Sequence, residues 1–167
     1  MTLDHCHLGD CRVLDPCCGS RMFWFDKTNP EVIFGDIREE QHTLCDGRTI
    51  FIAPDSRMDF RALPFPDERF SLVVFDPPHL VNAGPQSWMA KKYGKLGKTW
   101  QEVLQQGFRE CFRVLKEAGV LVFKWNETQI PLREILLIVD IPPLFGNKKP
   151  QKQKTHWLCF MKPNRRA

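Results

Sequence analysis

The chain has 167 residues, 43% of them hydrophobic, and a formal net charge of +4, values that fit one globular domain and exclude a disordered chain. No apolar run approaches the roughly 20 residues of a membrane helix, and the first residues lack the basic and apolar parts of a signal peptide. We therefore expect residues 1–167 to form a single soluble domain in the cytoplasm, with no membrane contact.

Predicted strands and helices alternate along the chain. The strands expected before residue 80 are 12–14, 32–34, a third at either 57–59 or 49–52, and 70–75. The run at 70–75 is continuously apolar, as in a strand covered on both faces. It stops at Asp76-Pro77-Pro78 because proline cannot donate to a sheet ladder.

The clearest predicted helix spans residues 100–117. Apolar side chains recur along it at helical spacing, Thr99 and Glu102 form a capping box at its start, and Gly119 ends it. The elements expected after it are a strand at 120–123, a helix at 132–139 and a last strand at 155–161. Elements in this order predict an α/β sandwich built around a largely parallel sheet.

Acidic residues follow the predicted strands at the point where each strand ends. They are Asp15, Asp36, Asp59 and Asp76. Each alone is typical of a turn, but the carboxyl ends of parallel strands meet at one edge of a sheet, where ligands bind. We therefore expect the four carboxylates to converge on one site.

The residues after the first two strands favour a nucleotide-like cofactor. Gly19 would let the backbone approach it closely, Asp36 would hold its two ribose hydroxyls, and Asp59 would accept a hydrogen bond from an adenine amino group. The first turn lacks the GxGxxG pattern of a dinucleotide site, which disfavours a nicotinamide cofactor. An acid in that turn suits a cofactor with a positive amino group.

The segment Asp76-Pro77-Pro78-His79 is the most specific pattern in the chain. An amino group on an aromatic base is a poor nucleophile, because its lone pair is delocalised into the ring. The Asp76 carboxylate and the Pro77 carbonyl can accept its two hydrogens and turn the lone pair toward an electrophilic methyl group, and paired prolines stiffen the loop. The alternative is a rigid turn that only ends the strand.

Both motifs carry a resemblance to a known family. Residues 14–20, LDPCCGS, resemble the cofactor motif of class I S-adenosylmethionine-dependent methyltransferases, and Asp76-Pro77-Pro78-His79 looks like the (D/N/S)PP(Y/F/W) motif of the amino-methyltransferases, which modify adenine N6 or cytosine N4. Residues 63–65 and 111–116 also look like parts of that fold, and the order of motifs over 12–125 matches. The whole chain is similar to small stand-alone methylases of phages and prophages.

The resemblance implies a Rossmann-like sandwich whose seven-stranded sheet is mostly parallel with an antiparallel last strand, and it implies S-adenosylmethionine as the cofactor. The cofactor-binding residues that it implies are Asp15, Pro16, Cys17, Gly19, Asp36, Asp59, Phe60 and Asp76. The catalytic residues that it implies are Asp76, Pro77, Pro78 and His79.

The chain departs from the family pattern in three respects. His79 stands where the family usually has an aromatic ring that stacks on the extruded base; imidazole can stack and can also donate a hydrogen bond, which leaves the target base open. The stretch between the first two strands is short, so the first helix is at most a turn or two. No separate target-recognition domain fits into 167 residues, so sequence specificity is low or comes from a partner or a second copy.

Two basic stretches point to an anionic partner. Residues 82–100 and 145–167 hold nearly half of the lysines and arginines and no acid. The parts expected to act as substrate loops are 82–100 and 145–154, where aromatic residues stand among lysines, although solvated surface loops are the alternative. The candidate substrate-binding residues are Trp88, Lys91, Lys92, Tyr93, Lys124, Trp125, Lys148 and Lys149.

The cysteines are not spaced as a disulfide framework or a zinc site. Several lie close to histidines near the start of the chain, namely His5, Cys6, His7, Cys11, Cys17 and Cys18. No CxxC pair occurs among them, so we expect no metal and mostly free thiols packed as small apolar groups. Cys17 and Cys18 are also conceivable nucleophiles for a cytosine C5 reaction, but no proline-cysteine loop follows the fourth strand.

These observations favour an enzyme that methylates an exocyclic amino nitrogen of a nucleic-acid base, adenine N6 ahead of cytosine N4 and DNA slightly ahead of RNA. One alternative is a methyltransferase that acts on a protein amide or a small molecule. Another is a non-catalytic scaffold subunit of a methyltransferase pair.

Overall fold

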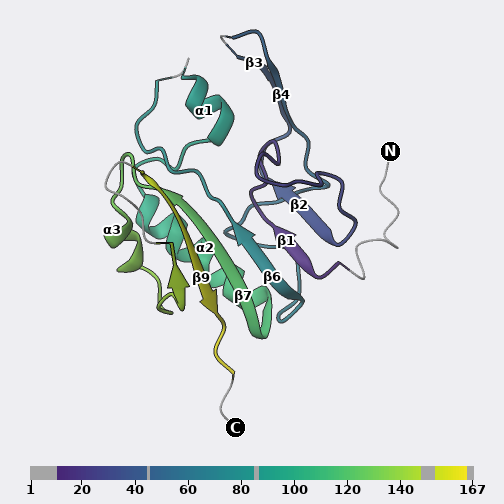
Figure 1. Cartoon of the computed structure of the whole chain (residues 1–167), viewed down its shortest axis with the longest axis vertical. Helices are drawn as coiled ribbons and strands as arrows, with labels where there is room; N and C mark the ends of the chain where they lie inside the picture. The colour runs from purple at the N-terminus through teal and green to yellow at the C-terminus, as the bar shows by residue number, and fades with distance from the viewer. Residues whose placement is uncertain (1–10, 45, 85–86, 148–152, 165–167) are drawn as a thin grey trace.

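The computed structural model describes residues 11–44, 46–84, 87–147 and 153–164, and a seven-stranded sheet forms its centre (Figure 1). The strands follow the order β5-β2-β1-β6-β7-β9-β8. Their bounds are β1 (Val13–Asp15), β2 (Val32–Asp36), β5 (Ser56–Arg57), β6 (Phe70–Phe75), β7 (Leu115–Asn126), β8 (Phe145–Gly146) and β9 (Thr155–Met161). Pairings with β9 are antiparallel and the others are parallel. The mostly parallel α/β sheet with an antiparallel last strand is confirmed.

Both candidate ranges for the third strand form strands, but in different sheets. β5 pairs with the end of β2, with Gly35 opposite Ser56 and Asp36 opposite Arg57. The range 49–52 is β4 (Thr49–Ile52), which pairs with β3 (Glu40–Thr43) in a separate antiparallel hairpin. This hairpin projects beyond the carboxyl end of the sheet (Figure 1). The sequence Glu-Gln-His-Thr of β3 lacks the apolar alternation that would have predicted it.

Helix α2 (Trp100–Val114) packs its apolar stripe on one face of the sheet. Leu104, Phe108 and Cys111 are buried there in one cluster with Phe75 of β6 and Phe123 of β7. Aromatic rings dominate this contact, with 5.3 Å between the Phe75 and Phe108 ring centroids and 4.9 Å between those of Phe108 and Phe123. Because this burial covers the two central strands, it supports the rim on which Asp76 lies.

Helix α2 begins at Trp100 after Thr99, as predicted, but its capping bond and its end differ from the expectation. The Thr99 side chain makes no capping hydrogen bond, and the helix ends at Val114 where Leu115 turns extended, with φ −72° and ψ 139°. β7 then begins at once: Leu115 pairs with Phe70 and Val120 with Leu72, so the residues between form a bulge. The later helix, α3 (Leu132–Leu136), is shorter than the predicted range 132–139.

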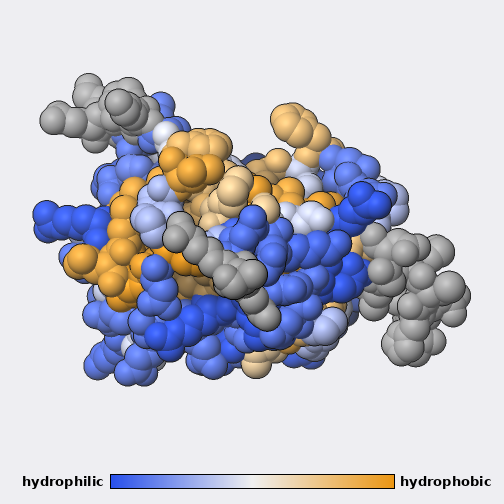
Figure 2. Space-filling model, turned by 90° about the horizontal axis from the view of Figure 1, so that it is seen from below, coloured by the Kyte–Doolittle hydropathy of each residue, from blue (hydrophilic) through white to orange (hydrophobic). Residues whose placement is uncertain are grey.

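The opposite face of the sheet carries no α-helix among the residues that the structure describes. Residues 16–31, between β1 and β2, form only turns, as their short length predicted. Trp24 packs edge-on against Phe34 of β2, and Phe23 packs against Trp157 of β9. In the view from below, apolar side chains gather mainly toward the upper left of the surface (Figure 2).

Cys17, Cys18, Cys111 and Cys159 are free thiols, as expected. Cys11, Cys18 and Cys111 are buried, and Cys17 and Cys159 are half-buried. Within the described ranges no group of histidine, cysteine and acidic residues is arranged to hold a metal ion, and His5, Cys6 and His7 lie outside those ranges. The same ranges contain no helix long and apolar enough to cross a bilayer.

The close contact of α2 with the sheet generates a stability prediction at Gly107. A Cβ placed there would lie 2.7 Å from the Phe60 ring, so Gly107→Ala should lower the free energy of unfolding by about 1–3 kcal/mol despite the better helix propensity of alanine. Urea unfolding monitored by circular dichroism measures this change. Gln106→Ala, on the exposed side of the same helix, is the matched control, and an equal or higher stability of Gly107→Ala would refute the packing.

Candidate active site

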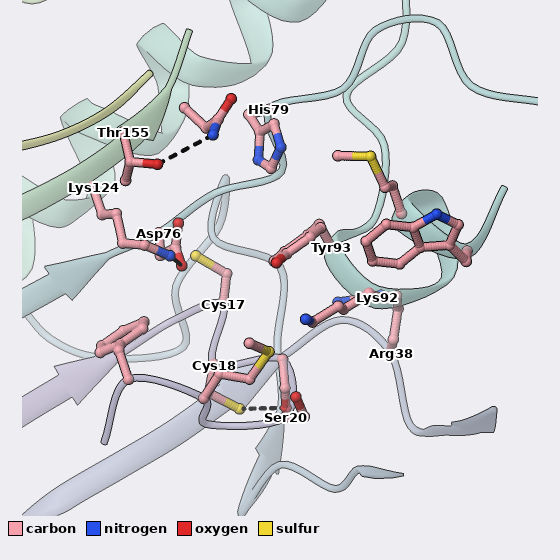
Figure 3. A pocket seen from close by; sticks show the side chains of 16 residues that line it. Cys17, Cys18, Ser20, Arg38, Asp76, His79, Lys92, Tyr93, Lys124 and Thr155 are labelled. Atoms are coloured by element: carbon pink, nitrogen blue, oxygen red, sulfur yellow. Dashed lines mark hydrogen bonds and ion pairs between the residues drawn. The ribbon is translucent and has the colours of Figure 1, made fainter. Parts of the chain in front are cut away.

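A cavity of about 380 Å³ lies beyond the carboxyl ends of β1, β6 and β7 (Figure 3). This volume lies within the range of small-ligand sites. The residues that line it are Cys17, Cys18, Gly19, Ser20, Met22, Phe23, Arg38, Asp76, His79, Trp88, Met89, Lys92, Tyr93, Lys124, Asn126 and Thr155. Its position agrees with the rule that ligands of parallel sheets bind at this edge.

Asp76 forms an ion pair with Lys124 on the wall of the cavity. The Lys124 Nζ atom lies 2.5 Å from Asp76 Oδ2, and both side chains are mostly buried. The same Nζ lies 5.2 Å from the centre of the Phe23 ring and 5.7 Å from that of Trp157, which is cation–π range. Burial raises the pKa of Asp76, while Lys124 opposes the rise by favouring the carboxylate. Within the described residues Oδ1 makes no hydrogen bond.

His79 lines the same cavity and contains a buried nitrogen without a hydrogen-bond partner in the described part of the chain. The residue is only 6% exposed, and its Nε2 has no hydrogen-bond partner among the described residues. Burial, and secondarily Lys124, lowers the pKa of His79 to about 4, so the ring is neutral at pH 7. The Tyr93 ring leans against it, with 5.2 Å between centroids and 54° between planes. A neutral imidazole can both donate and accept a hydrogen bond.

Asp15 lies beneath the cavity and does not line it. The carboxylate is fully buried: Oδ2 accepts a bond of 2.8 Å from Trp24 Nε1, and Oδ1 accepts one of 3.3 Å from the Cys17 N–H. It therefore holds the segment after β1 in place. Burial raises the pKa of the Cys17 thiol and that of Cys18, the latter to about 12, which argues against a thiolate nucleophile.

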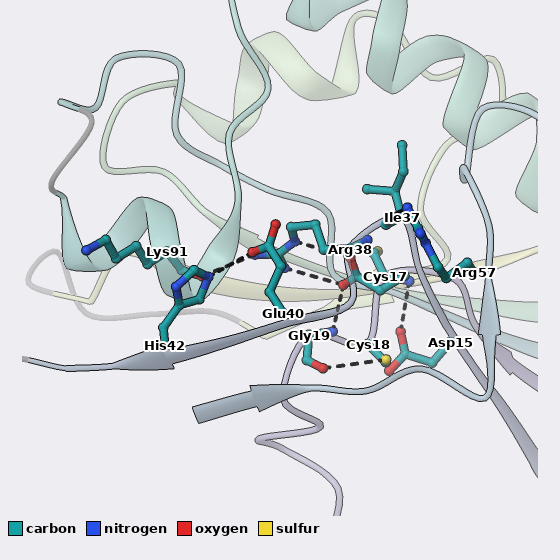
Figure 4. Close-up of polar contacts among 11 residues, drawn as sticks. Asp15, Cys17, Cys18, Gly19, Ile37, Arg38, Glu40, His42, Arg57 and Lys91 are labelled. Carbon is teal, nitrogen blue, oxygen red and sulfur yellow. Dashed lines mark hydrogen bonds and ion pairs between the residues drawn. The ribbon is translucent and has the colours of Figure 1, made fainter. Parts of the chain in front are cut away.

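Asp36 joins three parts of the site (Figure 4). Its Oδ2 accepts a 3.0 Å bond from the Gly19 N–H, and its Oδ1 accepts bonds of 2.9 and 3.2 Å from the Arg38 backbone N–H and Nε. Arg38 Nη1 in turn donates to the Lys91 carbonyl oxygen over 3.2 Å. Gly19 has φ +51°, a conformation that favours glycine.

Of the four acids only Asp76 lines the cavity, which corrects the expectation that all four converge there. The predicted site residues that the structure describes outside the lining are Asp15, Pro16, Asp36, Asp59, Phe60, Pro77, Pro78, Lys91 and Trp125. Asp59 turns away after β5 and pairs with Arg61 over 2.5 Å. Phe60 packs in the core against Phe75, and Trp125 is fully buried, with its Nε1 donating to the Ile130 carbonyl oxygen. β5 ends at Arg57, so the chain turns before Asp59 reaches the rim.

The first basic stretch contains a short helix that the sequence did not predict, α1 (Trp88–Tyr93). Its first turn is capped by Ser87, whose Oγ accepts a bond from the Ala90 N–H. The helix brings Trp88, Lys92 and Tyr93 to the cavity, with Lys92 Nζ 5.1 Å from the centre of the Tyr93 ring. The Lys91 side chain does not line the cavity, and Lys148 and Lys149 lie outside the described residues.

Sequence reasoning missed several residues of the cavity wall. They are Ser20, Met22, Phe23, Arg38, Met89 and Thr155. Most follow a predicted site residue by a few positions, as Phe23 follows Gly19 and Arg38 follows Asp36. Thr155 reaches the cavity only because β9 pairs with β7, which places it opposite Asn126.

Comparisons with known proteins establish the fold. No protein-family profile matches the chain, and no curated protein matches it. Among solved structures, a TehB-like S-adenosylmethionine-dependent methyltransferase from Corynebacterium glutamicum is similar, with TM-score 0.56 and 15% identity over 92% of this chain and 80% of that one. A methyltransferase of the same kind from Methanosarcina mazei has TM-score 0.54 and 14% identity over 98% of both chains. The PH0226 protein of Pyrococcus horikoshii has TM-score 0.55 and 17% identity over 90% and 81%.

The buried Asp15 generates a prediction about stability and pH. Burial raises the pKa of Asp15 from its ordinary value of 3.8 to about 7, so between these values the folded state holds a proton that the unfolded state lacks. Raising the pH from about 4 to 7 should therefore lower the free energy of unfolding through this residue.

The change that tests this is Asp15→Asn, which removes the titrating group and keeps an acceptor for Trp24 Nε1. Its Tm, relative to wild type, should rise as the pH increases from about 4 to 7. Differential scanning fluorimetry over this range provides the measurement, with the exposed Asp46→Asn as control. A constant Tm difference across the range would contradict the buried, proton-holding carboxyl.

Proposed function

We propose that this protein is an S-adenosylmethionine-dependent methyltransferase that acts on an exocyclic amino group of a nucleic-acid base. Adenine N6 is favoured over cytosine N4, and DNA slightly over RNA. The observation that carries the proposal is the Asp76 carboxylate at the cavity wall, held by Lys124 through one oxygen and followed by two prolines and His79. The fold of the similar solved methyltransferases supports the reaction class.

The residues present fit S-adenosylmethionine. Gly19 leaves the loop after β1 without a side chain at the cavity. Asp36 stands at the strand position where nucleotide folds hold ribose hydroxyls, but its carboxylate is buried beneath the cavity and bonds to the Gly19 N–H. Met22, Phe23 and Met89 give apolar walls against which the cofactor can pack. When bound, the cofactor supplies an electrophilic methyl group on a positive sulfur, which becomes a neutral thioether after transfer.

The chain's own groups prepare the amino nitrogen. Asp76 Oδ1 and the Pro77 carbonyl oxygen accept hydrogen bonds from the two N–H groups of the amino nitrogen. These bonds turn the nitrogen lone pair out of the base plane toward the methyl carbon. Lys124 fixes the carboxylate through Oδ2, so Oδ1 keeps its direction. After the N–C bond forms, the nitrogen carries one proton too many, and Asp76, whose pKa burial raises, can accept it.

The aromatic and basic residues around the opening would hold the base. Tyr93 and the half-exposed Trp88 of α1 offer stacking surfaces, and Lys92 lies between them to bind a phosphate. His79 lines the cavity and carries a buried Nε2 without a partner among the described residues, which would bond the ring nitrogen next to the amino group of adenine or cytosine. Sequence choice is left to a partner protein or a second copy.

A methyltransferase of a small molecule is the second candidate, because a cavity of about 380 Å³ lies within the range of small-ligand sites. The salt dependence of KM distinguishes the two candidate substrates. KM for a polynucleotide rises steeply with ionic strength, whereas KM for an uncharged small molecule does not.

Asp76→Ala should lower the single-turnover rate at saturating cofactor by at least about a hundredfold, because the amino group loses its acceptor and Lys124 its partner. Asp76→Asn keeps an amide oxygen as acceptor and should retain more activity than Asp76→Ala. The measurement is transfer of labelled methyl to single- and double-stranded DNA and RNA, with the exposed Asp140→Asn as the matched control. Full activity of Asp76→Ala would reject this role.

His79→Phe should lower kcat/KM about tenfold, because the variant keeps a ring but loses the Nε2 hydrogen bond. His79→Gln, which restores a donor and an acceptor, should recover part of the loss. The wild-type pH profile should show no titration near 6.5, since burial lowers the pKa of His79 to about 4. If His79→Phe matches wild type, stacking alone explains the residue.

A further inference from the structure

A second cleft, of about 570 Å³, lies between the segment after β1 and the β3–β4 hairpin. It shares part of its wall with the active-site cavity. The shared residues are Gly19, Ser20, Met22 and Lys92. The two spaces are therefore neighbours along one surface, and a ligand that fills the cavity can continue into the cleft.

The charged side chains that line this cleft are all cationic. They are Arg21, Lys27, Arg48 and Lys92. Arg21 and Arg48 are held by Asp55 and Asp46, at 2.7 and 2.6 Å, from outside the lining. In the part of the chain that the structure describes, Lys27 and Lys92 form no ion pair. A cleft with two uncompensated ammonium groups attracts anions.

Exposed apolar side chains lie beside these cations. Phe51 of β4 is 58% exposed and Met22 is 51% exposed, and both line the cleft. A solvent-exposed aromatic ring next to lysines is the combination that binds unpaired nucleic-acid strands, since bases stack on the ring and phosphates meet the ammonium groups. A surface that binds anions by charge alone would not require an exposed aromatic ring such as Phe51.

We propose that this cleft holds the nucleotides that flank the target base on an unpaired strand. Lys92 and Lys27 bind successive phosphates as the strand leaves the active-site cavity, and a flanking base stacks on Phe51. The inference rests on the proposed function and adds the β3–β4 hairpin as the part of the chain that contacts the strand.

Two variants outside the active-site cavity test this, Lys27→Ala and Phe51→Ala. The probe is a fluorescent single-stranded oligonucleotide of about 12 nucleotides with one adenine, as DNA and as RNA. Anisotropy gives its Kd at several salt concentrations, and methyl transfer to the same strand gives KM. The matched controls are Lys116→Ala, an exposed lysine at the other end of the sheet, and Leu137→Ala, an exposed apolar residue after α3.

Phe51→Ala should weaken binding roughly tenfold, the scale of one lost stacked base. Lys27→Ala should reduce the slope of log Kd against log salt by about 0.7, the value for one phosphate contact on a single strand. Both controls should match wild type. Wild-type binding and transfer with variants equal to the controls would overturn this inference alone. A wild type that neither binds nor methylates any strand would overturn the proposed function as well.

Discussion

Two buried carboxylates at the ends of β1 and β2 position the segment on which the site depends. No helix is present between these strands, so the backbone of residues 16–24 is held instead by Asp36 on the Gly19 N–H and by Asp15 on the Cys17 N–H and Trp24 Nε1. Burying a carboxylate is unfavourable unless it is hydrogen-bonded, and here the bonds are made to the loop itself. The loop geometry is therefore fixed by the same groups that sit beneath the cavity.

This anchoring extends to the reactive residues. With Trp24 fixed, the neighbouring Phe23 lies against Trp157, and the two rings flank the ammonium group of Lys124. Lys124 then holds one oxygen of Asp76 and leaves the other toward the cavity. The loop, the two aromatic rings and the Lys124–Asp76 ion pair thus position this wall of the cavity without a helix after β1. Because no helix forms between β1 and β2, the second face of the sheet carries no α-helix among the described residues.

The buried strands and the Asp76 segment follow from patterns within single stretches of sequence. Apolar runs such as Phe70–Phe75 identify buried strands, and the acid-proline-proline turn identifies a rim position, so these were predictable. What the sequence could not give depends on contacts between distant segments. Asp59 was expected at the rim, but β5 is too short to carry it there. Trp125 alternates to the core side of β7 while Lys124 faces the cavity, a register set only by pairing with β9.

The central claim is that Asp76 and Pro77 direct a methyl group to an amino nitrogen of a base. The most direct test is to digest nucleic acid methylated by the purified protein with labelled S-adenosylmethionine and to identify the labelled nucleoside by mass spectrometry. The account predicts label on an exocyclic amino nitrogen, N6 of adenine first and N4 of cytosine second. Label on a ring carbon or on the sugar, or no label on any polymer while the cofactor binds normally, would contradict it.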